Sequence, residues 1–190
     1  TARDHRLRVH FPTPIQAAAA DYDGHFEVVR RPLGVPTKGP GWVEDPRPEV
    51  PQRAFCDVTD GQRGLMLANR GLPEVEVSQA ETGDEMCLTL LRSVGWLSRD
   101  DIHARPGHAG PGFATPGAQM QGTWRFEYAL IPHLGGWQEA YPLAYAFQVP
   151  LRGALEPLHA GALPGSSTFL AHSPREWRIS AVKVAEDGRG

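Results

Sequence analysis

Glycine and proline interrupt this chain so often that its longest segment without either residue is 175–187. Inside a helix, proline costs about 3 kcal/mol and glycine about 1 kcal/mol relative to alanine. The longest uninterrupted segment is itself rich in β-branched residues, which favour strands over helices. The distribution of the 21 glycines and 18 prolines therefore argues against an all-helical fold.

Apolar and polar residues alternate in several short segments. In residues 6–11, Leu7, Val9 and Phe11 share one face and basic residues occupy the other. This period is typical of a half-buried antiparallel strand. The only helical pattern, residues 16–20, is too short to be stable by itself. The same alternation predicts strands at 25–30, 54–58, 65–68, 75–77, 86–92, 124–130, 145–149, 167–171 and 177–184.

Many short strands separated by turns predict an all-β protein, an antiparallel β-sandwich or barrel. Asp60 and Gly61 predict a tight hairpin turn, because both residues tolerate the backbone angles that such turns need. Two other connections, 31–53 and 93–122, are much longer. Connections of that length in a compact domain are usually functional or disordered.

Composition excludes several classes of protein. The chain is 41% hydrophobic and 22% charged, as in folded water-soluble proteins, and no apolar run approaches the ~20 residues of a membrane helix. A formal net charge of −3 argues against a nucleic-acid partner. Cys56 and Cys87 lie in apolar, strand-like contexts that favour buried free thiols over a disulfide or a metal site. We therefore expect a cytoplasmic protein without a membrane partner.

Motifs of self-contained active sites are absent from the sequence. It has no dinucleotide-binding or phosphate-binding glycine loop, no His-Glu-x-x-His pair and no Gly-x-Ser-x-Gly turn. The eight histidines are scattered, and none pairs with another at the spacing of metal ligands. The sequence thus predicts no catalytic residue and no metal ligand within this chain.

The densest polar segment, residues 91–111, follows directly on a predicted strand. Its arginine and aspartate side chains surround one tryptophan, which suits sugar binding through hydrogen bonds to hydroxyls and contact with an aromatic face. The alternative is a solvated loop held by internal Arg–Asp pairs. Arg70, in a rigid glycine- and proline-flanked turn, is a weaker candidate. The candidates for substrate binding or a domain interface are Arg70, Arg92, Trp96, Arg99, Asp100, Asp101 and Arg105.

The five tryptophans fall into two groups. Trp124 and Trp177 follow strand periodicity, so they are expected in the core. Trp42, Trp96 and Trp137 each follow a glycine in a predicted loop, where an aromatic side chain either anchors the loop or serves as a sugar platform.

Several segments resemble one family of enzymes. Residues 54–77, AFCDVTDGQRGLMLANRGLPEVEV, resemble a strand–turn–strand segment in the C-terminal half of family 38 glycoside hydrolases, the α-mannosidases and mannosylglycerate hydrolases. The resemblance extends from about residue 6 to the end of the chain. Further matching segments follow in order at 88–93 (LTLLRS), 95–101 (GWLSRDD), 114–119 (ATPGAQ), 126–133 (FEYALIPH) and 181–188 (AVKVAEDG).

The resemblance implies a galactose-mutarotase-like β-sandwich over residues 1–190, as a truncated part of a larger glycosidase. Its partners would be the N-terminal catalytic and helical domains of the same protein, and an α-mannoside. The aspartate nucleophile and the divalent metal, usually zinc, belong to those earlier domains in the family, whose reaction is retaining hydrolysis of α-mannosides. We therefore expect this chain alone to be inactive and to need no cofactor of its own. Apolar surface exposed by truncation would favour self-association.

The resemblance also bears on the polar segment. In eukaryotic members, an arginine-rich strand end followed by two aspartates and a further arginine lies where the sandwich meets the catalytic cleft. Arg92, Arg99, Asp100, Asp101 and Arg105 follow a comparable order, although the Gly-Trp-Leu of residues 95–97 departs from it. We hypothesise that this loop closes one wall of the sugar site or holds the domain interface.

Two other functions remain open from the sequence. A stand-alone carbohydrate-binding module would use tryptophans such as Trp42, Trp96 or Trp137 as platforms. A mutarotase-like sugar epimerase would need a histidine acid and a carboxylate base facing each other in one cleft.

Overall fold

The computed structural model describes residues 3–174, 179 and 181–189. The chain forms two compact units, Thr1–Leu151 and Arg152–Gly190. Every assigned strand and helix belongs to the first unit, whereas the described residues of the second follow an irregular path.

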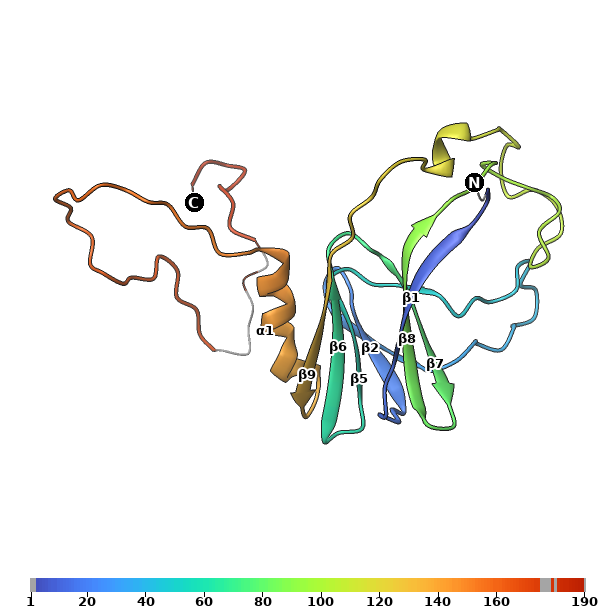
Figure 1. The fold of residues 1–190 in the computed structure, drawn as a ribbon, viewed down its shortest axis with the longest axis horizontal. Helices are drawn as coiled ribbons and strands as arrows, with labels where there is room; N and C mark the ends of the chain where they lie inside the picture. The colour runs from blue at the N-terminus through green and yellow to red at the C-terminus, as the bar shows by residue number, and fades with distance from the viewer. Residues whose placement is uncertain (1–2, 175–178, 180, 190) are drawn as a thin grey trace. The chain divides into compact units, whose positions relative to one another are not determined.

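The first unit contains two antiparallel sheets (Figure 1). Within each sheet, neighbouring strands pair in continuous register apart from an irregularity between Leu7 and Arg8. One sheet has the order β1 (Arg6–Pro12), β8 (Gly83–Arg92), β7 (Glu74–Ala80) and β4 (Val50–Pro51). The other has the order β3 (Val28–Pro32), β2 (Ala19–Asp23), β5 (Phe55–Thr59), β6 (Arg63–Asn69) and β9 (Tyr128–Leu134).

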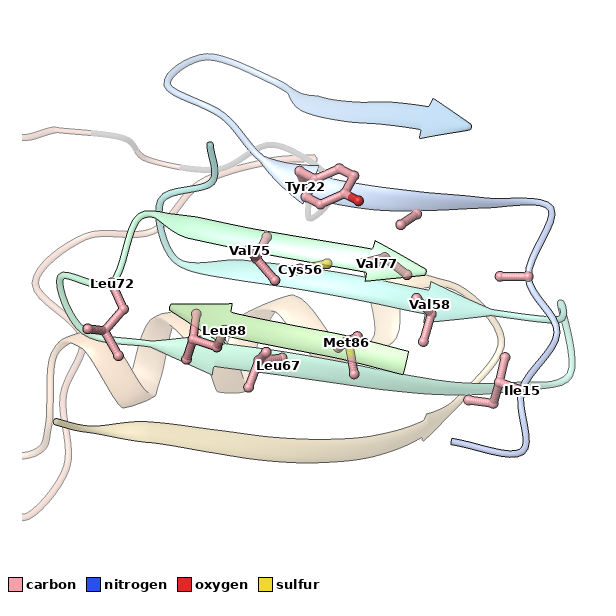
Figure 2. Packing of buried hydrophobic residues seen from close by; sticks show 12 residues of the cluster. Ile15, Tyr22, Cys56, Val58, Leu67, Leu72, Val75, Val77, Met86 and Leu88 are labelled. Atoms are coloured by element: carbon pink, nitrogen blue, oxygen red, sulfur yellow. The ribbon is translucent and has the colours of Figure 1, made fainter. Parts of the chain in front are cut away.

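The main core lies between the two sheets (Figure 2). Strand alternation sends Val75 and Val77 of β7 inward, and Met86 and Leu88 of β8 do the same. Leu67 faces them from the five-stranded sheet. Burying each such side chain contributes about 1.5–3 kcal/mol, so this alternation is what makes the two sheets stack.

A second core forms on the other face of the five-stranded sheet, against α1 (Trp137–Gln148). Phe55 of β5 and Met66 of β6 point to this face, opposite to their neighbours in the main core. Ala140 and Ala144, one helical turn apart, are fully buried there. Trp137 stacks on Phe55 with ring centroids 6.3 Å apart.

A buried carboxylate fixes α1 to the sheet. Tyr145 donates a hydrogen bond from its hydroxyl to Oδ1 of Asp23 at 2.8 Å, and the Ala54 N–H donates to Oδ2 of Asp23 at 3.0 Å. Nε of Arg53 also bonds Oδ2 of Asp23, at 3.2 Å. These contacts satisfy both oxygens of Asp23, as a buried carboxylate requires.

The sandwich and most of its strands agree with the sequence analysis. Residues 6–11 and 86–92 lie in neighbouring strands, and the predicted turn at Asp60 and Gly61 joins β5 to β6. Gly61 has a φ of +90°, and Oδ1 of Asp60 accepts two backbone N–H groups of the turn. The all-β sandwich prediction is therefore confirmed, with one helix added to it.

Several local predictions were wrong. Residues 145–149 belong mostly to α1 instead of forming a strand. Only the end of the 124–130 segment pairs as a strand. Residues 167–171 and the described part of 177–184 have no strand partner, while Trp177, Arg178 and Ser180 lie outside the described residues. That residues 1–190 form a single sandwich stays a prediction.

Both cysteines are free and buried, as predicted. Cys56 points into the core between the sheets, and Cys87 lies on the outer face of the four-stranded sheet. Burial raises the pKa of each thiol, that of Cys87 to about 11. Within the described residues, no helix has the length and apolar character needed to cross a membrane.

Candidate functional site: a polar groove at one end of the sandwich

A polar groove of about 840 Å³ lies at the end of the sandwich where β1 begins and β8 ends. Four of the residues predicted from sequence line it, namely Arg92, Trp96, Arg99 and Arg105. We call it the arginine groove. Because these residues come from one strand end and the following loop, the fold brings together most of the predicted cluster.

Backbone hydrogen bonds hold the loop that forms one wall. The Ser93 N–H donates to the His5 carbonyl at 2.8 Å, which ties the loop to the start of the chain. The Thr115 N–H donates to the Gly95 carbonyl at 2.8 Å, and Trp96 forms an antiparallel bridge with Ala114. A short 3-10 helix, η1 (Pro116–Gln119), follows. Segment 93–119 is therefore held in place by backbone hydrogen bonds and forms one wall of the groove.

Ion pairs orient two of the arginines. Arg99 makes two hydrogen bonds to Asp101, at 2.7 and 2.6 Å. This hydrogen bonding lowers the pKa of Asp101 below its usual value. Arg105 reaches across to Glu44 at 3.1 Å, and Asp100 remains largely exposed. Internal Arg–Asp pairing thus occurs, as the alternative from sequence proposed, but it coexists with the groove.

Arg92 is less constrained. Its guanidinium lies 3.4 Å from Glu74 and remains mostly exposed, whereas Arg6 pairs with both Glu49 and Glu74. Burial favours a higher pKa for Glu49, but the hydrogen bond and charge of Arg6 outweigh it and lower the pKa. Arg92 therefore keeps hydrogen-bonding capacity for a further partner.

Arg70 does not join this cluster. It donates to Oε2 of Glu127 at 2.6 Å and to the carbonyl of Phe147, and its guanidinium carbon lies 4.7 Å from the centre of the Phe147 ring. Phe147 belongs to the last turn of α1. The arrangement assigns Arg70 to anchoring the helix.

The tryptophans occupy different environments. Trp96 lines the arginine groove and is half exposed, as is Trp42, which lines none of the described pockets. Trp137 anchors α1 against Phe55 and Tyr141. The core prediction for Trp124 is wrong, because 51% of its surface is exposed.

The carboxylates of the groove were not predicted from the sequence. Glu49 and Glu74 face its arginines, and Glu44 pairs with Arg105. A signal existed for one of them: the alternation of residues 74–77 places Glu74 on the outward face of β7. Glu44 and Glu49 lie in the proline-rich connection, where no periodicity marks them.

The groove contains guanidinium donors, carboxylate acceptors and one aromatic face. Together these groups can bind the hydroxyls and the apolar face of a sugar. In the part of the chain that the structure describes, no three His, Cys, Asp or Glu side chains are arranged to hold a metal ion.

A buried Asp–His pair lies away from the groove, on the outer face of the five-stranded sheet. Nε2 of His133 lies 2.7 Å from Oδ1 of Asp57, and both side chains are almost completely buried. Burial raises the pKa of Asp57 to about 6, although His133 opposes the shift. Because the two groups bond directly, this pair leaves no space for a sugar between acid and base, so it does not support an epimerase.

Comparison with known proteins shows which family the chain belongs to. The family profile described as "Glycosyl hydrolases family 38 C-terminal domain" matches residues 2–103, more than half of the chain. The chain belongs to this family. The resemblance seen in the sequence is thereby confirmed, and neither the carbohydrate-binding module nor the epimerase is favoured.

Relatives of known sequence or structure agree. A protein of Halalkalibacterium halodurans named "Putative mannosylglycerate hydrolase" is 30% identical over 192 residues, which cover 100% of this chain and 19% of that protein. The crystal structure of an alpha-mannosidase from Enterococcus faecalis V583 matches with a TM-score of 0.65 and 35% identity, over 85% of this chain and 16% of that one. A family 38 protein from Enterococcus faecalis matches with a TM-score of 0.64 and 34% identity, over 85% of this chain and 17% of its own. This chain therefore spans less than a fifth of each relative.

Proposed function

We propose that this domain belongs to a longer family 38 enzyme that hydrolyses α-mannosides with retention of configuration. In that protein, the arginine groove faces the catalytic part and contributes to one wall of the sugar cleft. The observation that carries the proposal is the convergence of Arg92, Trp96, Arg99 and Arg105 on one open groove. Family membership supports the reaction class, and the names of the relatives support a mannoside substrate.

The proposal divides the catalytic and binding roles between this domain and the remaining part of the protein. We assign the aspartate nucleophile and the divalent metal, usually zinc in this family, to the remaining part of the protein. The domain's own contribution is to present guanidinium donors and an aromatic face at the cleft. The two buried free thiols suit a reducing cytoplasm, where we place the protein.

Replacing Arg92 by alanine in the full-length enzyme tests the proposal. We expect kcat/KM for an α-mannoside to fall about tenfold to a hundredfold, which corresponds to losing one charge-assisted hydrogen bond of about 1.5–3 kcal/mol. Steady-state kinetics on a chromogenic α-mannoside measures the change, and a thermal melt shows whether the protein remains folded.

Arg63→Ala is the matched control. The side chains of Arg92 and Arg63 are 65% and 63% exposed, but Arg63 is the first residue of β6 and lies outside the arginine groove. Arg63→Ala should leave kcat/KM unchanged. Equal kinetics for both variants and the parent enzyme would refute a role of Arg92 at the cleft.

A further inference from the structure

A second pocket, of about 700 Å³, opens where both sheets end in an edge strand. β3 contributes Val29 and Arg31, and β4 contributes Pro51. The turn between β2 and β3 forms its rim. We call it the edge pocket. It differs from the arginine groove in its lining, which is mainly apolar.

The two edge strands that border the pocket differ in length. β3 has five residues and β4 has only two. Val29 and Arg31 pair with Tyr22 and Ala20, whose side chains lie in the main core, so they face the same side of the sheet. β4 is the last assigned strand of one sheet, and β3 is the last assigned strand of the other. An edge strand of this kind presents backbone groups that can pair with another strand.

Two buried polar atoms beside the pocket have no partner among the described residues. Gln52 is 5% exposed and donates from Nε2 to the Leu72 carbonyl at 2.6 Å, but its Oε1 accepts no hydrogen bond. Nη1 of Arg31 also lacks a hydrogen-bond partner. The guanidinium carbon of Arg31 lies 5.2 Å from the centre of the Tyr22 ring. An unsatisfied buried polar group costs about 1–3 kcal/mol. A ligand that satisfied both atoms would need an N–H donor for Oε1 of Gln52 and an acceptor for Nη1 of Arg31.

The rim of the edge pocket carries a large apolar side chain that is exposed to solvent. Phe26 is fully exposed, at a relative accessibility of 103%, and Leu72 and Pro73 are apolar residues that line the same pocket. Aromatic side chains beside an apolar concavity are typical of residues that become buried when a partner binds. Charged side chains of both signs also line the pocket: Arg31 and Arg53 are basic, and Asp23 and Glu27 are acidic.

We propose that the edge pocket receives an extended segment from the remaining polypeptide of the longer protein. Such a segment supplies a backbone N–H for Gln52, a carbonyl or carboxylate for Arg31 and a strand beside β3, a common mode of peptide recognition. An apolar side chain of the segment packs on Phe26. The relatives, more than five times longer than the stretch they share with this chain, contain ample polypeptide to provide it. The inference rests on the proposal that the chain is part of a longer enzyme.

Photo-crosslinking in the full-length protein tests this inference. p-Benzoylphenylalanine is placed at position 26, the protein is irradiated, and crosslinked peptides are identified by mass spectrometry. The expected result is an intramolecular crosslink from position 26 to one segment outside residues 1–190. A crosslink within residues 1–190, a crosslink to a second copy, or no crosslink would overturn the proposal. The same probe at Val43, 67% exposed and outside the described pockets, is the control and should give no such product.

Hydrogen exchange gives an independent readout. In the full-length protein, Phe26→Asp should speed amide exchange in residues 28–31 about tenfold, because the docked segment opens more often. Val43→Asp should leave that exchange unchanged, and equal rates in both variants would count against docking. Mannoside hydrolysis measured on the same samples separates the two proposals: an active enzyme without the crosslink refutes the docked segment alone.

Discussion

Replacing Gly83 by alanine is expected to lower the free energy of unfolding by about 3–5 kcal/mol. Gly83 begins β8 with a φ of +143°, and an added Cβ would lie 2.0 Å from the backbone oxygen of Thr13. That oxygen cannot move away easily, because the Thr13 N–H donates to the Asp84 carbonyl at 2.8 Å and the Asp84 N–H donates to the Ile15 carbonyl at 2.7 Å. The substitution therefore breaks the junction of β1, β2 and β8. Urea unfolding followed by circular dichroism measures the loss.

Gly117→Ala serves as the control for this experiment. Gly117 lies in η1, and no heavy atom lies within 4 Å of the position that an added Cβ would take. Its unfolding midpoint should match that of the parent chain. If Gly83→Ala unfolded at the same urea concentration as Gly117→Ala, the close backbone approach at Thr13 would be wrong.

The second large effect is expected for Gly64→Ala in β6. An added Cβ would lie 2.1 Å from Cε1 of His133, whose ring crosses β6 at this residue to reach Asp57. Alanine must displace that ring and leave the buried Asp57 carboxylate without its partner. A buried acceptor left without its hydrogen-bond partner costs about 1–3 kcal/mol, and more when it is charged. The clash itself adds to this cost, so we expect the free energy of unfolding to fall by about 3–5 kcal/mol.

A double-mutant cycle separates this clash from a general effect of alanine in the strand. Once His133→Ala has removed the ring, adding Gly64→Ala should cost less than it does in the parent chain, by more than about 1 kcal/mol. Denaturant unfolding of the four proteins in the cycle supplies the comparison. Strict additivity of the two substitutions would contradict the arrangement of His133 over Gly64.

The sandwich was predictable because alternation is a local signal. Residues 6–11 and 86–92 show the period of a half-buried strand, and they pair with each other in the structure. The helix was missed because Tyr145, Phe147 and Val149 also alternate, and Pro142 within α1 argued against a helix. A helical signal was present in Trp137, Ala140, Tyr141 and Ala144, whose spacing follows a helical turn. Packing of this face on β5 and β6 outweighs the cost of the proline.

The candidate site was predictable only in part. The density of arginine and aspartate after a strand end led to Arg92, Trp96, Arg99 and Arg105, which line one groove. Sequence spacing gave no sign that Arg70 would turn toward Phe147, because that contact joins residues 77 positions apart. The partners Glu44 and Glu49 were equally hidden, since they approach from the connection between β3 and β4. The Asp57–His133 pair likewise depends on strand order, which alternation alone does not determine.

The position of a bound α-mannoside in a structure of the full-length enzyme tests the central claim most directly. That claim is that the arginine groove faces the catalytic part and helps to form the sugar cleft. We expect the sugar at the rim of the groove, with the guanidinium of Arg92 bonded to a hydroxyl directly or through one water molecule. A structure with the mannoside bound elsewhere and the groove open to bulk solvent would contradict the claim.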